Sequence, residues 1–162
     1  MQPELKIVPA LTSLEARRQA SEAFMVSDLA KSGLTPADIE ATAHAYLENE
    51  RTKIRLKNGQ IVDFLVGEAV VAAYRFPYYS RDGKAITDAF SIPIMYRERR
   101  SYAEWVDPAI SKRKYNQPSR RRVGDIATIP YLHPNRLKNR GNGVYDIHEG
   151  EKKHACPPLR QG

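Results

Sequence analysis

The sequence predicts a mixed α+β fold: an N-terminal helical hairpin packed on a small antiparallel sheet of two hairpins, then a basic, loop-rich C-terminal arm and one final short strand. Two observations carry this prediction. Apolar side chains recur at helical intervals in the first 50 residues, whereas residues 53–96 contain period-2 alternation, an apolar run and two turn dipeptides. With 162 residues, of which 41% are hydrophobic and 28% charged, the chain is long enough to bury one core.

Two helices are expected in the N-terminal third. The first begins near Thr12, because Thr12 and Glu15 have the spacing of a capping box, and it ends before Gly33, which stands where a left-handed C-cap belongs. The second begins at Pro36, since a proline at the first helical position loses no hydrogen bond, and it is expected to run to about Asn49. Together these helices would form the hairpin.

The predicted sheet follows from a change of period. Residues 53–57 alternate between charged and apolar side chains, and Asn58-Gly59 is a strong signal for a two-residue hairpin turn. The apolar run Ala69–Tyr74 predicts a buried strand, and Asp82-Gly83 predicts a second turn that leads into strands before residue 96. Prolines and clustered cations mark the following segment as loop-rich, and a last strand is expected over residues 144–147.

These elements divide the chain into three parts. The predicted organisation is an irregular lead-in over residues 1–11, one α+β domain over residues 12–143, and a terminal segment over residues 144–162. Within the domain, residues 12–50 are expected to be helical, 53–96 to form the sheet, and 97–143 to form the basic arm.

Charge is distributed unevenly between the two halves of the chain. The formal net charge is +7, yet residues 1–96 carry 11 basic and 12 acidic side chains, while residues 97–162 carry 15 and 7. Such a concentration of cations favours a polyanionic partner. The longest apolar run is far shorter than the roughly 20 residues that cross a bilayer, and Cys156 has no second cysteine to pair with. We therefore expect a soluble, cytoplasmic protein without a membrane partner.

The densest group of cations lies within the basic arm. Two runs of three cations stand within eleven residues without an acidic residue between them, Arg97, Arg99 and Arg100 precede them, and Tyr115 separates them. Guanidinium and ammonium groups bind phosphates without reading sequence, and aromatic rings stack on unpaired bases. The expected nucleic-acid-binding residues are Arg97, Arg99, Arg100, Lys112, Arg113, Lys114, Tyr115, Arg120, Arg121 and Arg122, with single-stranded DNA as ligand. The alternative is that the aromatic rings belong to the core and the cations to solvated loops.

Three stretches of the chain resemble a known family in their order and spacing. They are Leu29-Ala30-Lys31-Ser32-Gly33-Leu34-Thr35-Pro36-Ala37-Asp38-Ile39; then Phe76-Pro77-Tyr78-Tyr79-Ser80-Arg81-Asp82-Gly83-Lys84 with Met95-Tyr96-Arg97-Glu98-Arg99-Arg100 and Lys114-Tyr115-Asn116-Gln117-Pro118; and Val144-Tyr145-Asp146-Ile147-His148-Glu149-Gly150-Glu151-Lys152-Lys153. Together they resemble the uncharacterised domain that precedes or overlaps a Toprim domain in replication primases and primase-helicases of phages, plasmids and other mobile elements.

The resemblance implies a role for Glu149. In Toprim enzymes the glutamate after the first strand binds a divalent metal together with a later Asp-x-Asp pair, and Glu149 occupies that position. Mg²⁺ needs several oxygen ligands, and no Asp-x-Asp follows Glu149 in this sequence. We therefore expect no cofactor and no catalysis by this chain alone, with Mg²⁺ entering only if another chain completes the site. His148, His154 and Cys156 lack the paired spacing of a structural zinc site.

The sequence thus favours a non-catalytic nucleic-acid-binding module of a replication system, which positions single-stranded or forked DNA and has replication proteins as possible partners. A second hypothesis is a truncated primase remnant or protein-interaction module without activity of its own. A third is a metal-dependent enzyme that a partner chain completes through Glu149. Salt-dependent binding to DNA separates the first hypothesis from the second.

Overall fold

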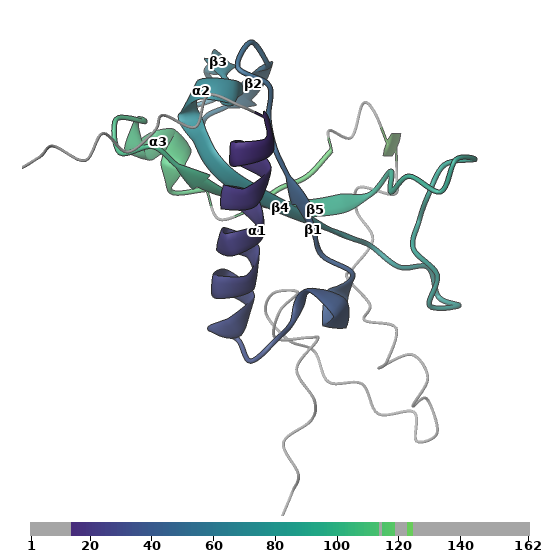
Figure 1. Cartoon of the computed structure of the whole chain (residues 1–162). Coiled ribbons are helices and arrows are strands. Elements are labelled where there is room, and N and C mark those ends of the chain that lie inside the picture. The colour runs from purple at the N-terminus through teal and green to yellow at the C-terminus, as the bar shows by residue number, and fades with distance from the viewer. Residues whose placement is uncertain (1–13, 114, 119–122, 125–162) are drawn as a thin grey trace, which may run out of the picture.

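The computed structural model describes residues 14–113, 115–118 and 123–124 of the chain (Figure 1). In this part a four-stranded antiparallel sheet has the order β1-β4-β5-β6, and a separate two-stranded sheet pairs β2 with β3. The mixed α+β class is confirmed. The elements are α1 (Leu14–Ala30), η1 (Pro36–Ile39), β1 (Thr42–His44), β2 (Arg51–Arg55), β3 (Ile61–Leu65), α2 (Val66–Ala69), β4 (Val70–Pro77), β5 (Tyr96–Tyr102), α3 (Pro108–Ser111) and β6 (Tyr115–Asn116).

Helix α1 ends as the sequence predicts. Gly33 adopts a φ of +69°, and the Leu34 N–H donates to the Leu29 carbonyl at 3.1 Å, which closes the C-terminus of the helix. Leu29 is fully buried against the sheet. The Ser21 hydroxyl donates to the His44 carbonyl of β1 at 2.9 Å and accepts from the Ala73 N–H of β4 at 3.1 Å. The helix is therefore fixed to two strands by hydrogen bonds as well as by apolar packing.

The second helix of the expected hairpin is replaced by a single turn and a strand. The Thr35 N–H donates to the Asp38 carboxylate at 2.6 Å, and this bond starts the 3₁₀ helix η1. Glu40 then takes a left-handed conformation with a φ of +51°, which ends the turn. Thr42 and the next two residues pair with β4 instead of continuing a helix. The helical spacing of the apolar residues was misleading here because hydrogen bonding to β4 outweighs local helix propensity.

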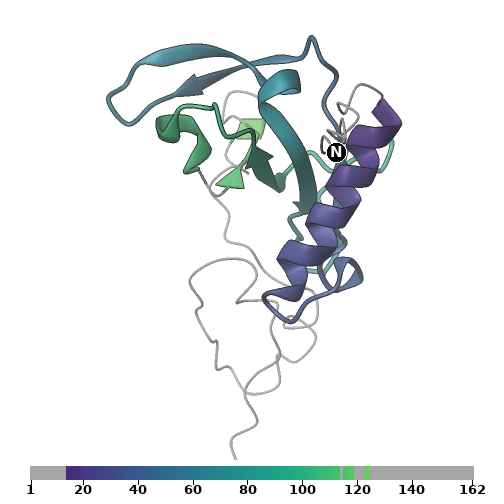
Figure 2. The ribbon, with the colours of Figure 1, turned by 60° about the vertical axis from the view of Figure 1, so that its left-hand side comes forward.

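The hairpin at Asn58-Gly59 is confirmed. β2 and β3 pair in the register Arg51↔Leu65 to Arg55↔Ile61, and Gly59 has a φ of +85° at the turn. In Figure 2 this ribbon projects from the top of the molecule away from α1, and α3 lies beneath it. The hairpin forms a sheet of its own and does not extend the main sheet as expected.

Strand β4 matches the predicted apolar run, but the segment after it differs from the prediction. Asp82-Gly83 makes the expected turn, with Gly83 at a φ of +77°, yet residues 85–95 form only isolated bridges. Strand β5 pairs with β4 from Pro77↔Tyr96 to Val70↔Tyr102, so the start of the expected loop-rich arm lies inside the sheet. The cations of β5 are accommodated there because they are paired, as described below. The final strand expected over residues 144–147 lies outside the described residues.

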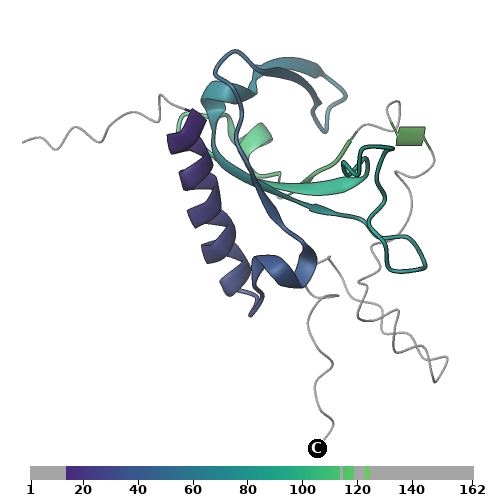
Figure 3. The ribbon, with the colours of Figure 1, turned by 45° about the vertical axis from the view of Figure 1, so that its right-hand side comes forward.

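The register gives the sheet two chemically different faces. On one face Tyr74 and its neighbours pack on α1. Figure 3 shows the helix running alongside the sheet. On the other face Thr42, Arg75, Glu98 and Asn116 stand side by side across all four strands. The β2–β3 hairpin and α3 cover part of this second face with a smaller apolar cluster that includes Phe64 and Ile110, whereas the rest is polar and partly open.

Candidate functional site

The ten residues predicted to bind nucleic acid do not form one loop. Six of them are described: Arg97, Arg99, Arg100, Lys112, Arg113 and Tyr115. The other four, Lys114, Arg120, Arg121 and Arg122, lie outside the described residues, as does the candidate metal ligand Glu149. The six that can be placed separate into three groups on different parts of the fold.

Arg97 and Arg99 form the first group, on the face of the sheet that carries α1. Arg97 Nε donates to the Tyr78 hydroxyl at 2.7 Å. Arg99 Nε lies 3.4 Å from Asp28 Oδ2 of α1, and its guanidinium lies 5.8 Å from the centre of the Tyr115 ring. Tyr115 is itself half-buried. Arg99 therefore links β5 to α1 and to the Tyr115 ring of β6, and Arg97 is held by Tyr78, so neither belongs to a solvated arm.

Arg100 belongs to a network on the opposite face. Its guanidinium is paired with the carboxylate of Glu98, and Arg100 Nη2 donates to the Tyr46 hydroxyl at 2.9 Å. Tyr46 in turn donates to Glu98. Arg75 Nε donates to the other carboxylate oxygen of Glu98 at 2.5 Å. Because the side chain of Arg100 is only 9% exposed, its first role is to neutralise Glu98.

The network determines the charge states of its members. Burial raises the pKa of Glu98, but the guanidiniums of Arg100 and Arg75 and the bond from Tyr46 outweigh it, so the pKa lies below the usual value. Burial and the charge of Glu98 raise the pKa of Tyr46. Burial and the nearby Arg75 lower the pKa of His44, which edges this network. At neutral pH the network therefore contains one carboxylate and two guanidiniums beside a neutral imidazole.

Lys112 and Arg113 form the third group, at the end of α3. The Asp107 side chain caps α3 by accepting from the Ala109 N–H at 2.7 Å, which fixes the direction in which this short helix leaves the sheet. The Arg113 guanidinium then donates to the backbone carbonyl of Arg55, the last residue of β2. Arg113 thereby joins the predicted cation run to the β2–β3 hairpin.

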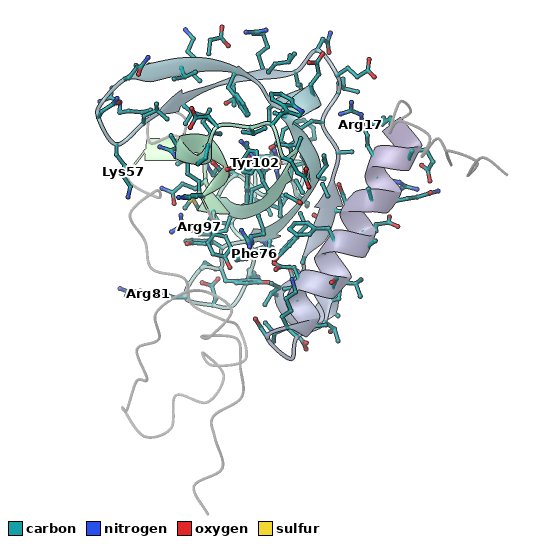
Figure 4. All side chains as sticks on the ribbon, turned by 90° about the vertical axis from the view of Figure 1, so that its left-hand side faces the viewer. Arg17, Lys57, Phe76, Arg81, Arg97 and Tyr102 are labelled. Carbon is teal, nitrogen blue, oxygen red and sulfur yellow. The ribbon has the colours of Figure 1, made fainter. Side chains whose placement is uncertain are left out.

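The hairpin supplies further cations that the sequence interpretation did not include in the site. Lys53, Arg55 and Lys57 are exposed, and Figure 4 places Lys57 at the end of the hairpin on the side of the molecule away from α1. We name Lys53, Arg55, Lys57, Lys112 and Arg113 the basic hairpin patch. The signal was present in the alternation of residues 53–57, which places every second side chain on one face. Summing charge over residues 1–96 concealed it, because acidic residues elsewhere cancel these cations.

The remaining expectations concern metals, membranes and aromatic stacking. The described ranges contain no cluster of three or more histidine, cysteine, aspartate or glutamate residues suited to a metal ion. No helix in the part that the structure describes has the length and apolar character to cross a bilayer. Trp105 is 67% exposed, whereas Tyr102 packs on Phe64 with ring centres 6.4 Å apart. Of these two rings, only that of Trp105 is largely open to solvent.

Comparison of the chain with protein-family models, with curated proteins and with solved structures finds no match. The resemblance to the region before a Toprim domain stays a prediction.

Proposed function

We propose that this protein is a nucleic-acid-binding module that holds single-stranded DNA along the basic hairpin patch. The observation that carries the proposal is the hydrogen bond from Arg113 to the Arg55 carbonyl. It brings two cation runs together that are more than 50 residues apart in sequence. Lys112 and Arg113 are the first two cations of the predicted run Lys112-Arg113-Lys114, and Lys114 follows them directly in the sequence.

The electrostatics of the hairpin support this proposal. Residues 51–65 contain four cations and one carboxylate, that of Asp63, which lies opposite Lys53 in the strand register and whose Oδ1 is 3.1 Å from Arg51 Nε. Lys53 and Arg55 are two positions apart in β2, about 7 Å along the strand, which is close to the spacing of successive phosphates in an extended nucleic-acid strand, and Lys57 follows at the turn. Like charges at this spacing repel one another unless an anion neutralises them.

An exposed aromatic residue lies a few positions before the α3 end of the patch in the sequence. Trp105 precedes α3 and Lys112 follows it, so the two residues flank one short helix in the sequence. An exposed indole ring beside phosphate-binding cations is a common arrangement for single-stranded nucleic acids, because every base offers a face on which the ring can stack. The resemblance to primase-associated regions makes forked replication DNA, together with replication proteins in the cytoplasm, the first setting in which to test this function.

Removal of two patch charges should lower the affinity for DNA and should also make that affinity less sensitive to the salt concentration. For the double variant Arg55→Gln with Lys57→Gln, we expect the plot of log association constant against log salt concentration to become less steep. The magnitude of its negative slope should decrease by about 1.4, since each phosphate contact to a single strand contributes about 0.7. The measurement is a fluorescence anisotropy titration with a labelled oligo-dT at several salt concentrations.

Trp105→Ala should lower the affinity for DNA with little change in the slope of the same salt titration, because stacking of a base on the indole ring involves no phosphate charge.

The matched control removes the same two kinds of charge from the opposite side of the fold. Arg18→Gln with Lys31→Gln alters an exposed cation on α1 and another just after it, and it should leave both affinity and slope unchanged. Equal losses in the two double variants would indicate a nonspecific effect of net charge and contradict a defined patch. If the native chain binds without salt dependence, or does not bind, the proposed function is wrong.

A further inference from the structure

A second site lies on the polar face of the sheet, away from the basic hairpin patch. The open end of this face contains a pocket of about 410 Å³, which is within the range of small-molecule sites. Residues from three strands and from the long β4–β5 connection line it. Those used in the argument below are Thr42, His44, Arg75, Ile92, Pro93 and Tyr96.

The buried network beside the pocket carries an uncompensated positive charge. Two guanidiniums, those of Arg75 and Arg100, are paired with the single carboxylate of Glu98. The nearby His44 is neutral because burial and Arg75 lower its pKa. Two further carboxylates lie nearby: Glu40 stands at the pocket and is exposed to solvent, where water screens its charge, whereas half-buried Glu50 acts on His44 and accepts from the Leu47 N–H at 2.7 Å. A positive charge that is partly withdrawn from water in this way favours an anion as its partner.

Arg75 is oriented to provide that contact. Its Nε is used by Glu98, and among the residues the structure describes neither terminal nitrogen of Arg75 donates a hydrogen bond. The guanidinium lies 4.4 Å from the centre of the Tyr96 ring, and the side chain is 29% exposed. Ring and carboxylate together fix the plane of the guanidinium. Its unused donors are therefore available to a group with two acceptor oxygens.

The walls of the pocket indicate what such a group is attached to. Ile92 and Pro93 contribute apolar surface, and Ile92 is 60% exposed. Thr42 adds a hydroxyl, and the buried Nε2 of His44 has no hydrogen-bond partner among the described residues. One cation, apolar walls and a few polar atoms together form the arrangement that binds amphipathic small molecules.

We propose that this pocket binds a small organic anion, in which a carboxylate or phosphate group accepts from the terminal nitrogens of Arg75 and an apolar body rests on Ile92, Pro93 and the Tyr96 ring. The inference is independent of DNA binding, because it uses a different surface and none of the residues of the basic hairpin patch. The residual positive charge of the Glu98 network favours an anionic ligand over a neutral one, and the apolar walls favour a ligand whose remaining part is apolar.

The full chain is titrated separately with benzoate, phenyl phosphate and neutral benzamide, and saturation-transfer NMR detects the binding of each compound. At least one of the two anions should bind saturably, and the ratio of their affinities tells whether a carboxylate or a phosphate is preferred. Benzamide should bind at least tenfold more weakly, since it lacks the charge that strengthens a bond to guanidinium. Arg75→Gln should weaken anion binding by about tenfold or more for the same reason.

A second variant keeps the test valid if Arg75→Gln fails to fold. Ile92→Glu places a negative charge at an exposed position of the pocket and should weaken both anions, whereas Ile61→Glu, at a similarly exposed position of β3, should have no effect. The proposal is overturned if neither anion binds at about 10 mM, where a Kd of about 1 mM would fill most sites. Equal affinities for benzamide and the anions, or for Ile92→Glu and the native chain, would also overturn it.

Discussion

Replacing Glu98 by glutamine is expected to lower the free energy of unfolding by about 3–5 kcal/mol, the usual cost of removing one partner from a buried ion pair. Glu98 is 1% exposed and accepts from Tyr46, Arg75 and Arg100. Glutamine has nearly the same shape but only one acceptor oxygen, and its amide group presents donors to other donors. Two guanidiniums would then lose their counter-charge. Urea unfolding followed by circular dichroism measures the loss.

Acidification provides an independent check of the same network. The pKa of Glu98 is lower in the folded chain than its ordinary value of 4.5. Its stabilising contribution is therefore complete above the pKa of the unfolded chain and is lost as the pH falls through the folded pKa. The difference in stability between native and Glu98→Gln proteins should shrink below about pH 4.5. A difference that stays constant on acidification would contradict the ion pair.

The control is Glu104→Gln, which removes the same charge from an exposed position just beyond β5. Surface substitutions of this kind change stability by about 0.5 kcal/mol or less. If Glu104→Gln were as damaging as Glu98→Gln, the effect would reflect the overall charge of the chain and not the buried pair. Circular dichroism at neutral pH shows whether both variants keep the native fold.

Local signals were sufficient to predict several elements of this fold. Gly33 and Asn58-Gly59 indicate where the chain must adopt a positive φ or a tight turn, and both positions have the predicted conformation. The apolar run that becomes β4 predicts a buried strand, and most residues of β4 are buried. The helix end, the hairpin turn and the buried strand each depend on a few neighbouring residues, so the sequence alone is enough to predict them.

Elements and contacts that depend on residues distant in sequence were not predicted correctly. Thr42–His44 forms a strand because β4 lies beside it, and nothing in the local apolar spacing indicates this pairing. In the same way Glu98 and Arg100 look like part of a solvated charged run, whereas Tyr46, 52 positions before Glu98, helps to bury them. The candidate interface required the same kind of information, since only the fold brings Arg113 to Arg55.

Gly67 provides the second large effect, and it too depends on a segment that lies well before it in the sequence, residues 47–50. The α2 turn fits against the chain that leads into β2: the Gly67 N–H donates to the Glu50 carbonyl at 3.1 Å, and its own carbonyl accepts from Arg17. A Cβ atom added to Gly67 would lie 1.7 Å from the Leu47 carbonyl oxygen and 2.6 Å from that of Glu48. Both obstacles are backbone atoms, which cannot rotate away as a side chain can.

We therefore expect Gly67→Ala to lower the free energy of unfolding by about 3 kcal/mol or more, at the upper end of what overpacking costs, because residues 47–50 must move away from α2. Gly33→Ala is the matched control. Its added methyl group meets nothing within 4 Å, and only the strain of a φ of +69° remains, which costs about 1–2 kcal/mol. Urea unfolding of both variants measures the two costs. A loss for Gly67→Ala no greater than that for Gly33→Ala would mean that α2 does not pack as closely against residues 47–50 as the structure shows.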